Sequence, residues 1–132
     1  MSAQHLSVSK QQTLLAALDF TPPSDYLVFI FSNNIIHDHC NYSYLGIDGS
    51  YLYGATDLIA TNLDYNAAEF YPGYLLIGSN GGGEALAIEK ATGYFVVTPF
   101  IGHDEETPVI IGQTWPAFWQ RLQAGNLFGD NI

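Results

Sequence analysis

Three short apolar segments separated by turn residues do most to limit the fold of this 132-residue chain. They are "YLLIG" (74–78), "EALAIEK" (84–90) and "YFVVTPF" (94–100), and each has the length and the flanking residues of a strand. The segment "ATG" (91–93) predicts a short hairpin loop between the last two, and "TPVIIG" (107–112) suits a further extended segment. Because strands joined by such short connections pair antiparallel, we expect a mostly antiparallel sheet in this part of the chain.

The glycine run Gly81–Gly83, followed by Glu84, is compatible with a phosphate-binding loop or with a turn. A phosphate loop needs a helix after the glycines, whose free N–H groups face the anion. Here the following residues alternate with the period of a strand, the lysine and hydroxyl of a nucleotide loop are missing, and Glu84 would repel a phosphate. We therefore expect a strand-to-strand turn with positive φ and no bound cofactor.

Helices are expected on both sides of these strands. Residues 8–18 repeat apolar side chains at helical spacing, and Ser7 or Ser9 is a suitable cap. The run 24–32 is ambiguous, since Val, Ile and Phe favour a strand, whereas two prolines followed by Ser24 and Asp25 are typical of a helix start. The last helix is predicted from Thr114 as its cap to Gly125 as its stop, with an apolar stripe of Trp115, Phe118, Trp119 and Leu122.

Between these parts the sequence predicts a hairpin and a short helix. Residues 42–54 alternate, and Asp48-Gly49 suits a two-residue turn, which places Tyr51 and Tyr53 on the return strand. The helix that follows has Thr56 as its expected cap, and its inward side chains are expected to be Leu58, Ile59 and Leu63. The whole chain, 1–132, is then a single α+β domain with its core at about 8–124. In it, N-terminal helices and a C-terminal helix flank a mostly antiparallel central sheet.

The charge balance is strongly acidic, with thirteen Asp and Glu against three Lys and Arg and a net charge of −10. Such a field disfavours direct contact with nucleic acid or an anionic membrane and attracts a basic partner. The single cysteine, Cys40, excludes an intrachain disulfide. No signal peptide is visible, and the longest apolar run (26–31) is too short to span a membrane, so we expect a cytoplasmic protein.

Two polar clusters carry residue types that chemistry uses. "HDHC" (37–40) contains metal-ligand types, but adjacent ligands give poor tetrahedral geometry and no second ligand pair follows, so no metal site is expected. "GHDEE" (102–106) gathers Asp104, Glu105 and Glu106, which suit acid–base work, a cation site, a solvated loop or an acidic contact surface. The tyrosines of the hairpin suit either a core or an interface.

Four segments, taken in order, resemble the SUKH superfamily. They are "PPSDYLVFIFSNN", "AAEFYPGYLLIGSNGGGEALAIE", "YFVVTPFIGHDEE" and "TWPAFWQRL", and the likeness runs from about the first helix to Leu122. The most specific mark is the apolar strand followed by "GSNGGGE" and an alternating strand. Asn80, where the family often has Asp, and Asn33-Asn34, in place of a glycine pair, depart from the pattern, and both changes still suit turns. The resemblance favours a helix at 24–32.

The resemblance implies binding rather than catalysis. SUKH domains include a yeast cell-wall-synthesis regulator and many bacterial immunity proteins that neutralise toxins delivered between cells. We therefore expect a non-catalytic immunity protein whose partner is a cognate, basic protein toxin, such as a nuclease, with a regulatory or scaffolding module as the alternative. The candidate partner-binding residues are Glu84, Asp104, Glu105, Glu106, Tyr51 and Tyr53.

Overall fold

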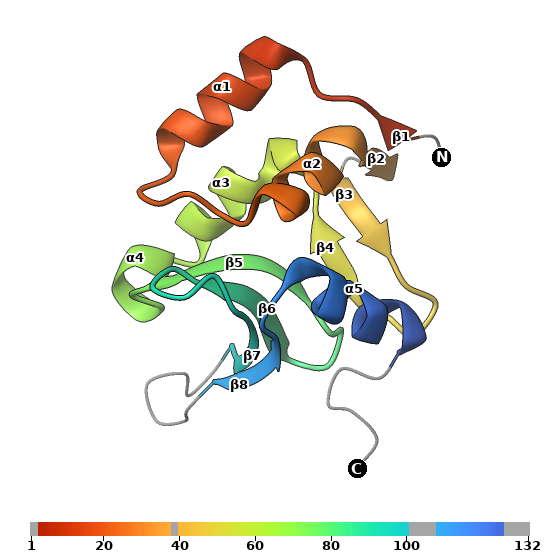
Figure 1. Ribbon diagram of the computed structural model, residues 1–132, viewed down its shortest axis with the longest axis vertical. Helices are drawn as coiled ribbons and strands as arrows, with labels where there is room; N and C mark the ends of the chain where they lie inside the picture. Colours follow the sequence, from red (N-terminus) through yellow and green to blue (C-terminus); the bar gives the residue numbers. More distant parts are fainter. Residues whose placement is uncertain (1–2, 38–39, 101–107, 126–132) are drawn as a thin grey trace.

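A computed structural model describes residues 3–37, 40–100 and 108–125, in which helices surround one antiparallel sheet (Figure 1). The strands are β1 (Ala3–Gln4), β2 (Asn34–His37), β3 (Cys40–Leu45), β4 (Tyr51–Tyr53), β5 (Tyr74–Ser79), β6 (Glu84–Glu89), β7 (Phe95–Pro99) and β8 (Val109–Gly112). The helices are α1 (Val8–Ala17), α2 (Ser24–Ser32), α3 (Ala55–Asp64), α4 (Ala67–Phe70) and α5 (Trp115–Ala124). These elements confirm the predicted α+β class.

The strands follow one another in the sheet in the order of the sequence, from β1 to β8, and each pairs antiparallel with its neighbours. The three segments that were predicted as strands are β5, β6 and β7, which lie side by side and which we call the central strands. A side chain at Gly78 would collide with the carbonyl oxygen of Tyr51, so the close approach of β4 to β5 requires glycine there.

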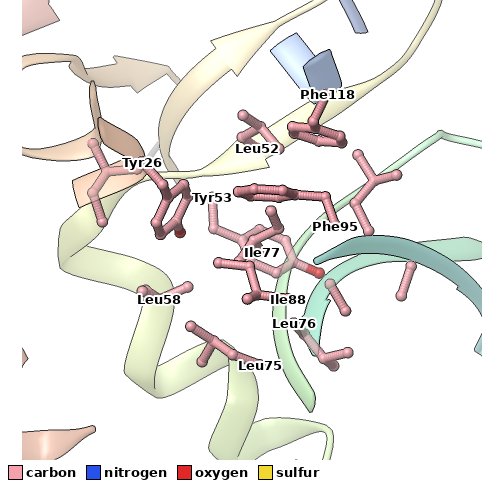
Figure 2. Packing of buried hydrophobic residues seen from close by; sticks show 14 of the residues in the cluster. Tyr26, Leu52, Tyr53, Leu58, Leu75, Leu76, Ile77, Ile88, Phe95 and Phe118 are labelled. Carbon is pink, nitrogen blue, oxygen red and sulfur yellow. The ribbon is translucent and has the colours of Figure 1, made fainter. Parts of the chain in front are cut away.

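One face of the central strands is covered by α2 and α5. Cross-strand partners share a face, so Leu75, Ile88 and Phe95 lie on the same side of the sheet. Phe118 of α5 stacks on Phe95 at 4.8 Å between ring centroids, and the ring of Tyr26 from α2 lies 6.3 Å from it. Figure 2 shows Phe95 and Phe118 packed among aliphatic side chains of the sheet. Burying each such aromatic ring contributes about 2–3 kcal/mol.

The helix ends agree with the sequence at several points. Ser7 accepts a hydrogen bond from the N–H of Lys10 at the start of α1, and Thr114 accepts one from Ala117 at the start of α5. Gly125 ends α5 with a left-handed φ of 69°. The ambiguous run 24–32 is the helix α2, in which burial of an apolar face outweighs the strand propensity of its residues.

Three local predictions are wrong. The hairpin between β3 and β4 does not close as a two-residue turn, because Gly46 donates to the carbonyl oxygen of Ser50 and thus leaves three residues in the loop. The cap of α3 is Gly54 rather than Thr56, with no side-chain hydrogen bond. Leu63 is 70% exposed, because α3 is covered on one side only and its last turn extends past the core.

The structure also contains three short elements that the sequence analysis did not identify, β1, β2 and α4. Each has four residues or fewer, too few for a periodic pattern to show. No helix within the described parts of the chain has the length and apolar character that crossing a membrane requires.

Candidate partner-binding site

The glycine turn between β5 and β6 is closed by its own side chains. The side-chain oxygen of Asn80 accepts from the N–H groups of Gly82 and Glu84, at 2.9 and 3.3 Å. The hydroxyl oxygen of Ser79 accepts from the N–H of Gly81 at 3.0 Å. Because these donors already have partners within the turn, they are not free to bind a phosphate. The turn is therefore a structural element, as the sequence analysis expected.

Glu84 lies at the edge of this turn, where it is half-buried. Its carboxylate accepts a hydrogen bond from the side-chain amide of Asn80 at 2.8 Å, which holds the charge in one position. Gly81 has a φ of +80°, and an added Cβ would lie 2.7 Å from the carbonyl oxygen of Gly49 in the β3–β4 hairpin. The two turns thus pack against each other and form one rigid end of the sheet.

Five tyrosines from three parts of the chain gather beside this end, and we call them the tyrosine cluster: Tyr42, Tyr51, Tyr53, Tyr65 and Tyr71. The ring of Tyr51 lies 5.5 Å from that of Tyr42 and 6.0 Å from that of Tyr53. This contact follows from the strands, since Tyr51 and Tyr53 lie two residues apart on β4 and Tyr42 pairs with Tyr53 across to β3.

Phe100 joins the C-terminal part of the sheet to this cluster. The ring of Tyr65 stacks on Phe100 with 4.9 Å between centroids and an interplanar angle of 18°. The hydroxyl of Tyr71 donates to the carbonyl oxygen of Phe100 at 2.7 Å. The N–H of Phe100 donates to the carbonyl oxygen of Gly83 at 3.1 Å, so the cluster and the glycine turn share this residue.

The tyrosines differ in exposure and in their role in the cluster. Tyr53 is 7% exposed and Tyr71 is 4% exposed, so both act as supports. Tyr42 and Tyr51 are half-buried, and Tyr65 is 41% exposed, so these three side chains are partly accessible. The predicted contact residue Tyr51 is thus accessible, whereas Tyr53 is mostly covered.

Burial raises the pKa of several hydroxyls of the cluster. Desolvation raises the pKa of Tyr53 well above its usual range, and the nearby hydroxyls of Tyr51, Tyr65 and Tyr71 raise it further. The pKa of Tyr42 is also raised, first by desolvation and then by a hydrogen bond with Cys40. A neutral phenol donates and accepts hydrogen bonds but is a poor general base at neutral pH. The arrangement thus offers aromatic rings and neutral hydroxyls for contact.

Acidic groups border the cluster. The carboxylate of Asp57 accepts from the backbone N–H and the side-chain amide of Asn41, at 2.9 and 3.1 Å, and its charge is one of the causes that raise the pKa of Tyr42. The predicted contact residues Asp104, Glu105 and Glu106 lie outside the described residues. In the sequence they follow Phe100 by four to six positions.

The metal-ligand types of "HDHC" are only partly described. His37 ends β2 and Cys40, which is exposed, begins β3, while Asp38 and His39 lie outside the described residues. Across the described residues, no group of three or more His, Cys, Asp or Glu side chains has the arrangement of a metal site.

No local pattern in the sequence connects Tyr65, Tyr71 and Phe100 with the hairpin tyrosines. The segment "DYNAAEFYPG" (64–73) shows several aromatic residues among polar ones, but it has no helical or strand period that would place them. The chain path from α3 through α4 into β5 sets the positions of Tyr65 and Tyr71, and the end of β7 sets the position of Phe100. A scan against protein-family models and a search of curated proteins each gave no match to this chain.

Proposed function

We propose that this protein is a non-catalytic immunity protein that binds a basic protein toxin and blocks its active site, with the tyrosine cluster at the centre of the contact. The resemblance to SUKH domains suggests this class of function. The observation that carries the proposal is the convergence of Tyr42, Tyr51 and Tyr65, from two strands and a helix end, on one partly exposed site.

The physical chemistry of the cluster suits a protein partner. Tyrosine offers a large rigid contact area with few rotatable bonds and a hydroxyl that bonds at its tip, and it is enriched at interface hot spots. Lys and Arg side chains of a partner also gain from contact with aromatic faces. Tyr53 and Tyr71 are buried next to the exposed rings of Tyr51 and Tyr65, and fixed neighbours of this kind reduce the entropy that a side chain loses on binding.

The negative charge has a different role in this proposal. Asp57 borders the cluster, and the net charge of −10 gives the chain a field that attracts a positively charged active site. Such a field raises the association rate more than the affinity. Glu84 and the acidic residues 104–106 would then act in steering, while the tyrosine rings determine how long the complex lasts.

The proposal is tested by co-expressing the protein with the toxin domain encoded by the adjacent gene. We expect rescue of growth and a complex that survives size-exclusion chromatography. The Tyr65→Ala variant is expected to weaken this complex about 30-fold, which corresponds to the ~2 kcal/mol of a hot-spot truncation. Tyr94→Ala is the matched control, since Tyr94 precedes β7 at the end of the sheet away from the glycine turn.

Two results would contradict the proposal. One is the absence of both rescue and complex at micromolar concentration, and recovery of only housekeeping proteins in a pull-down would then point to the regulatory or scaffolding alternative. The other is an equal effect of Tyr65→Ala and Tyr94→Ala on a complex that does form, which would move the contact away from the tyrosine cluster.

A further inference from the structure

An apolar groove runs between α1 and α3, away from the tyrosine cluster. It consists of two adjoining cavities of about 300 and about 210 Å³, which share Ala17 and Ile59 in their linings. The larger one is lined mainly by apolar side chains of both helices, including Leu14 and Ala55. The smaller one continues past Leu18 towards α4. In Figure 1, α1 lies at the outside of the molecule, next to α3.

The groove exists because α1 contacts α3 over only part of its length. Leu14 is the one buried residue within α1, and the positions that face α3 one turn later carry the small side chain of Ala17. Across the groove, Ala55 is equally small, so the two helices do not interdigitate along their whole length. The space left between them has a volume of about 300 Å³, which is at the lower end of the range for small-molecule sites, and its lining is mainly apolar.

The cationic side chains of this acidic chain are concentrated at the groove. Lys10 lines one cavity and Lys90 the other, and together they are two of the three Lys and Arg residues that the sequence contains. The ammonium of Lys90 lies 2.9 Å from the carboxylate of Asp19, which balances its charge. Lys10 is exposed and has no ion pair among the described residues, so its ammonium is available at the other end.

We propose that this groove binds a linear amphiphile with an apolar chain and a carboxylate head, such as a medium-chain fatty carboxylate. The head pairs with the ammonium of Lys10, and the chain lies along Leu14, Ala17 and Ile59 towards the second cavity. From Lys10 to Ala17 the helix axis covers about 10 Å, which sets the length of chain that one cavity holds. Binding here does not depend on the proposed function of the tyrosine cluster.

The charge pattern favours this class of ligand over others. A cationic amphiphile would be attracted to the acidic surface in general but repelled at Lys10, whereas an anion without an apolar chain gains nothing from the groove. A fatty carboxylate pairs with the ammonium of Lys10 and also fills the apolar groove. Each methylene that enters the groove is expected to tighten binding about fourfold, until the groove is filled.

The experiment is a nuclear magnetic resonance titration of the isotope-labelled protein with octanoate and decanoate below their micelle-forming concentrations. We expect saturable shifts of the amides of α1 and α3, with decanoate binding about 15-fold more tightly than octanoate. Decyltrimethylammonium is the probe with the same chain and opposite head, and it should bind more weakly at these amides. The Lys10→Glu variant is expected to reverse the preference between the two heads.

Two further variants separate groove binding from non-specific effects. Ala17→Phe fills the space shared by both cavities and should weaken decanoate binding at least tenfold. Arg121→Gln on α5 removes one positive charge away from the groove and should leave binding unchanged, whereas Lys10→Gln, with the same charge change, should weaken it. Equal binding of the two heads, no shifts in α1 and α3, or full binding by a folded Ala17→Phe variant would overturn the proposal.

Discussion

The hydroxyl of Tyr26 provides a direct test of how the core is stabilised. Tyr26 is fully buried in α2, and its hydroxyl oxygen has no hydrogen-bond partner among the described residues. Its ring contacts Phe95 at 6.3 Å and Trp115 at 5.7 Å, so the aromatic packing does not depend on the oxygen. Replacing Tyr26 with Phe keeps these ring contacts and removes the unsatisfied group. We therefore expect the Tyr26→Phe variant to be more stable than the parent protein.

The size of this effect follows from two opposing costs. An unsatisfied buried hydroxyl costs about 1–3 kcal/mol of desolvation, and the space left by one oxygen atom costs on the order of 0.5 kcal/mol. The net gain in the free energy of unfolding is then about 0.5–2.5 kcal/mol. With an unfolding entropy of about 2.1 cal/mol/K per residue, each kcal/mol raises Tm of a chain this long by about 4 °C. The expected rise in Tm is about 2–10 °C.

The measurement is thermal and urea unfolding of Tyr26→Phe beside a matched variant, Tyr71→Phe. The hydroxyl of Tyr71 donates to the carbonyl oxygen of Phe100 at 2.7 Å, so the same chemical change there removes a hydrogen bond and should lower stability by about 1 kcal/mol. Opposite signs for the two variants support the reasoning. If Tyr26→Phe is as unstable as Tyr71→Phe, or more so, the hydroxyl of Tyr26 contributes a stabilising contact and the argument fails.

Three other outcomes are expected. Burial raises the pKa of Tyr26 far above its usual range, so only the unfolded state ionises above about pH 10, and the free energy of unfolding then falls as the pH rises. In urea unfolding above this pH, the free energy of unfolding of Tyr26→Phe should fall less steeply than that of the parent protein, by about 1.4 kcal/mol per pH unit. Identical pH slopes for the two proteins would contradict this. Gly81→Ala should lose about 1–3 kcal/mol because of its positive φ and the nearby hairpin carbonyl. Gly82→Ala, where an added Cβ would meet only the Asn80 side chain at an ordinary contact distance of 3.6 Å, should lose under about 0.5 kcal/mol. Similar Tm values for the two variants would refute the packing of the turns. The side-chain amide of Asn62 accepts from the N–H of Leu76 and donates to its C=O, both at 2.9 Å, so Asn62→Ala should lose about 2–4 kcal/mol of stability. Hydrogen exchange at the Leu76 amide should become faster in this variant. An unchanged exchange rate would show that these hydrogen bonds do not form.

The sequence was most informative where one local rule acted alone. The helix α5 has a Thr114 cap, an apolar stripe and a Gly125 stop, and all three were visible as residue types at fixed spacing. The central strands β5, β6 and β7 were equally clear, because turn residues separate three apolar segments. Run 24–32 required more, since its composition fits a strand and only its proline-led start indicates α2.

The misses occur where tertiary contacts decide. Leu63 has helical spacing from Leu58 but extends beyond the core, which no local pattern reveals. The tyrosine cluster combines strands β3 and β4 with the connection around α4, and only the chain path shows that Tyr65 and Tyr51 belong to one site. Asn62 gives no sign in the sequence that it completes the edge of β5 in place of a neighbouring strand.

The order of the strands has a consequence for how this chain folds during synthesis. Because every strand pairs with the one made just before it, each new strand finds its partner already synthesised, and only the pairs β1–β2 and β4–β5 have helices between their strands. The exception is the covering of Phe95, which needs Phe118 from the last helix. Until α5 is released, the nascent sheet exposes an apolar face, and that interval is when the chain most needs protection from aggregation.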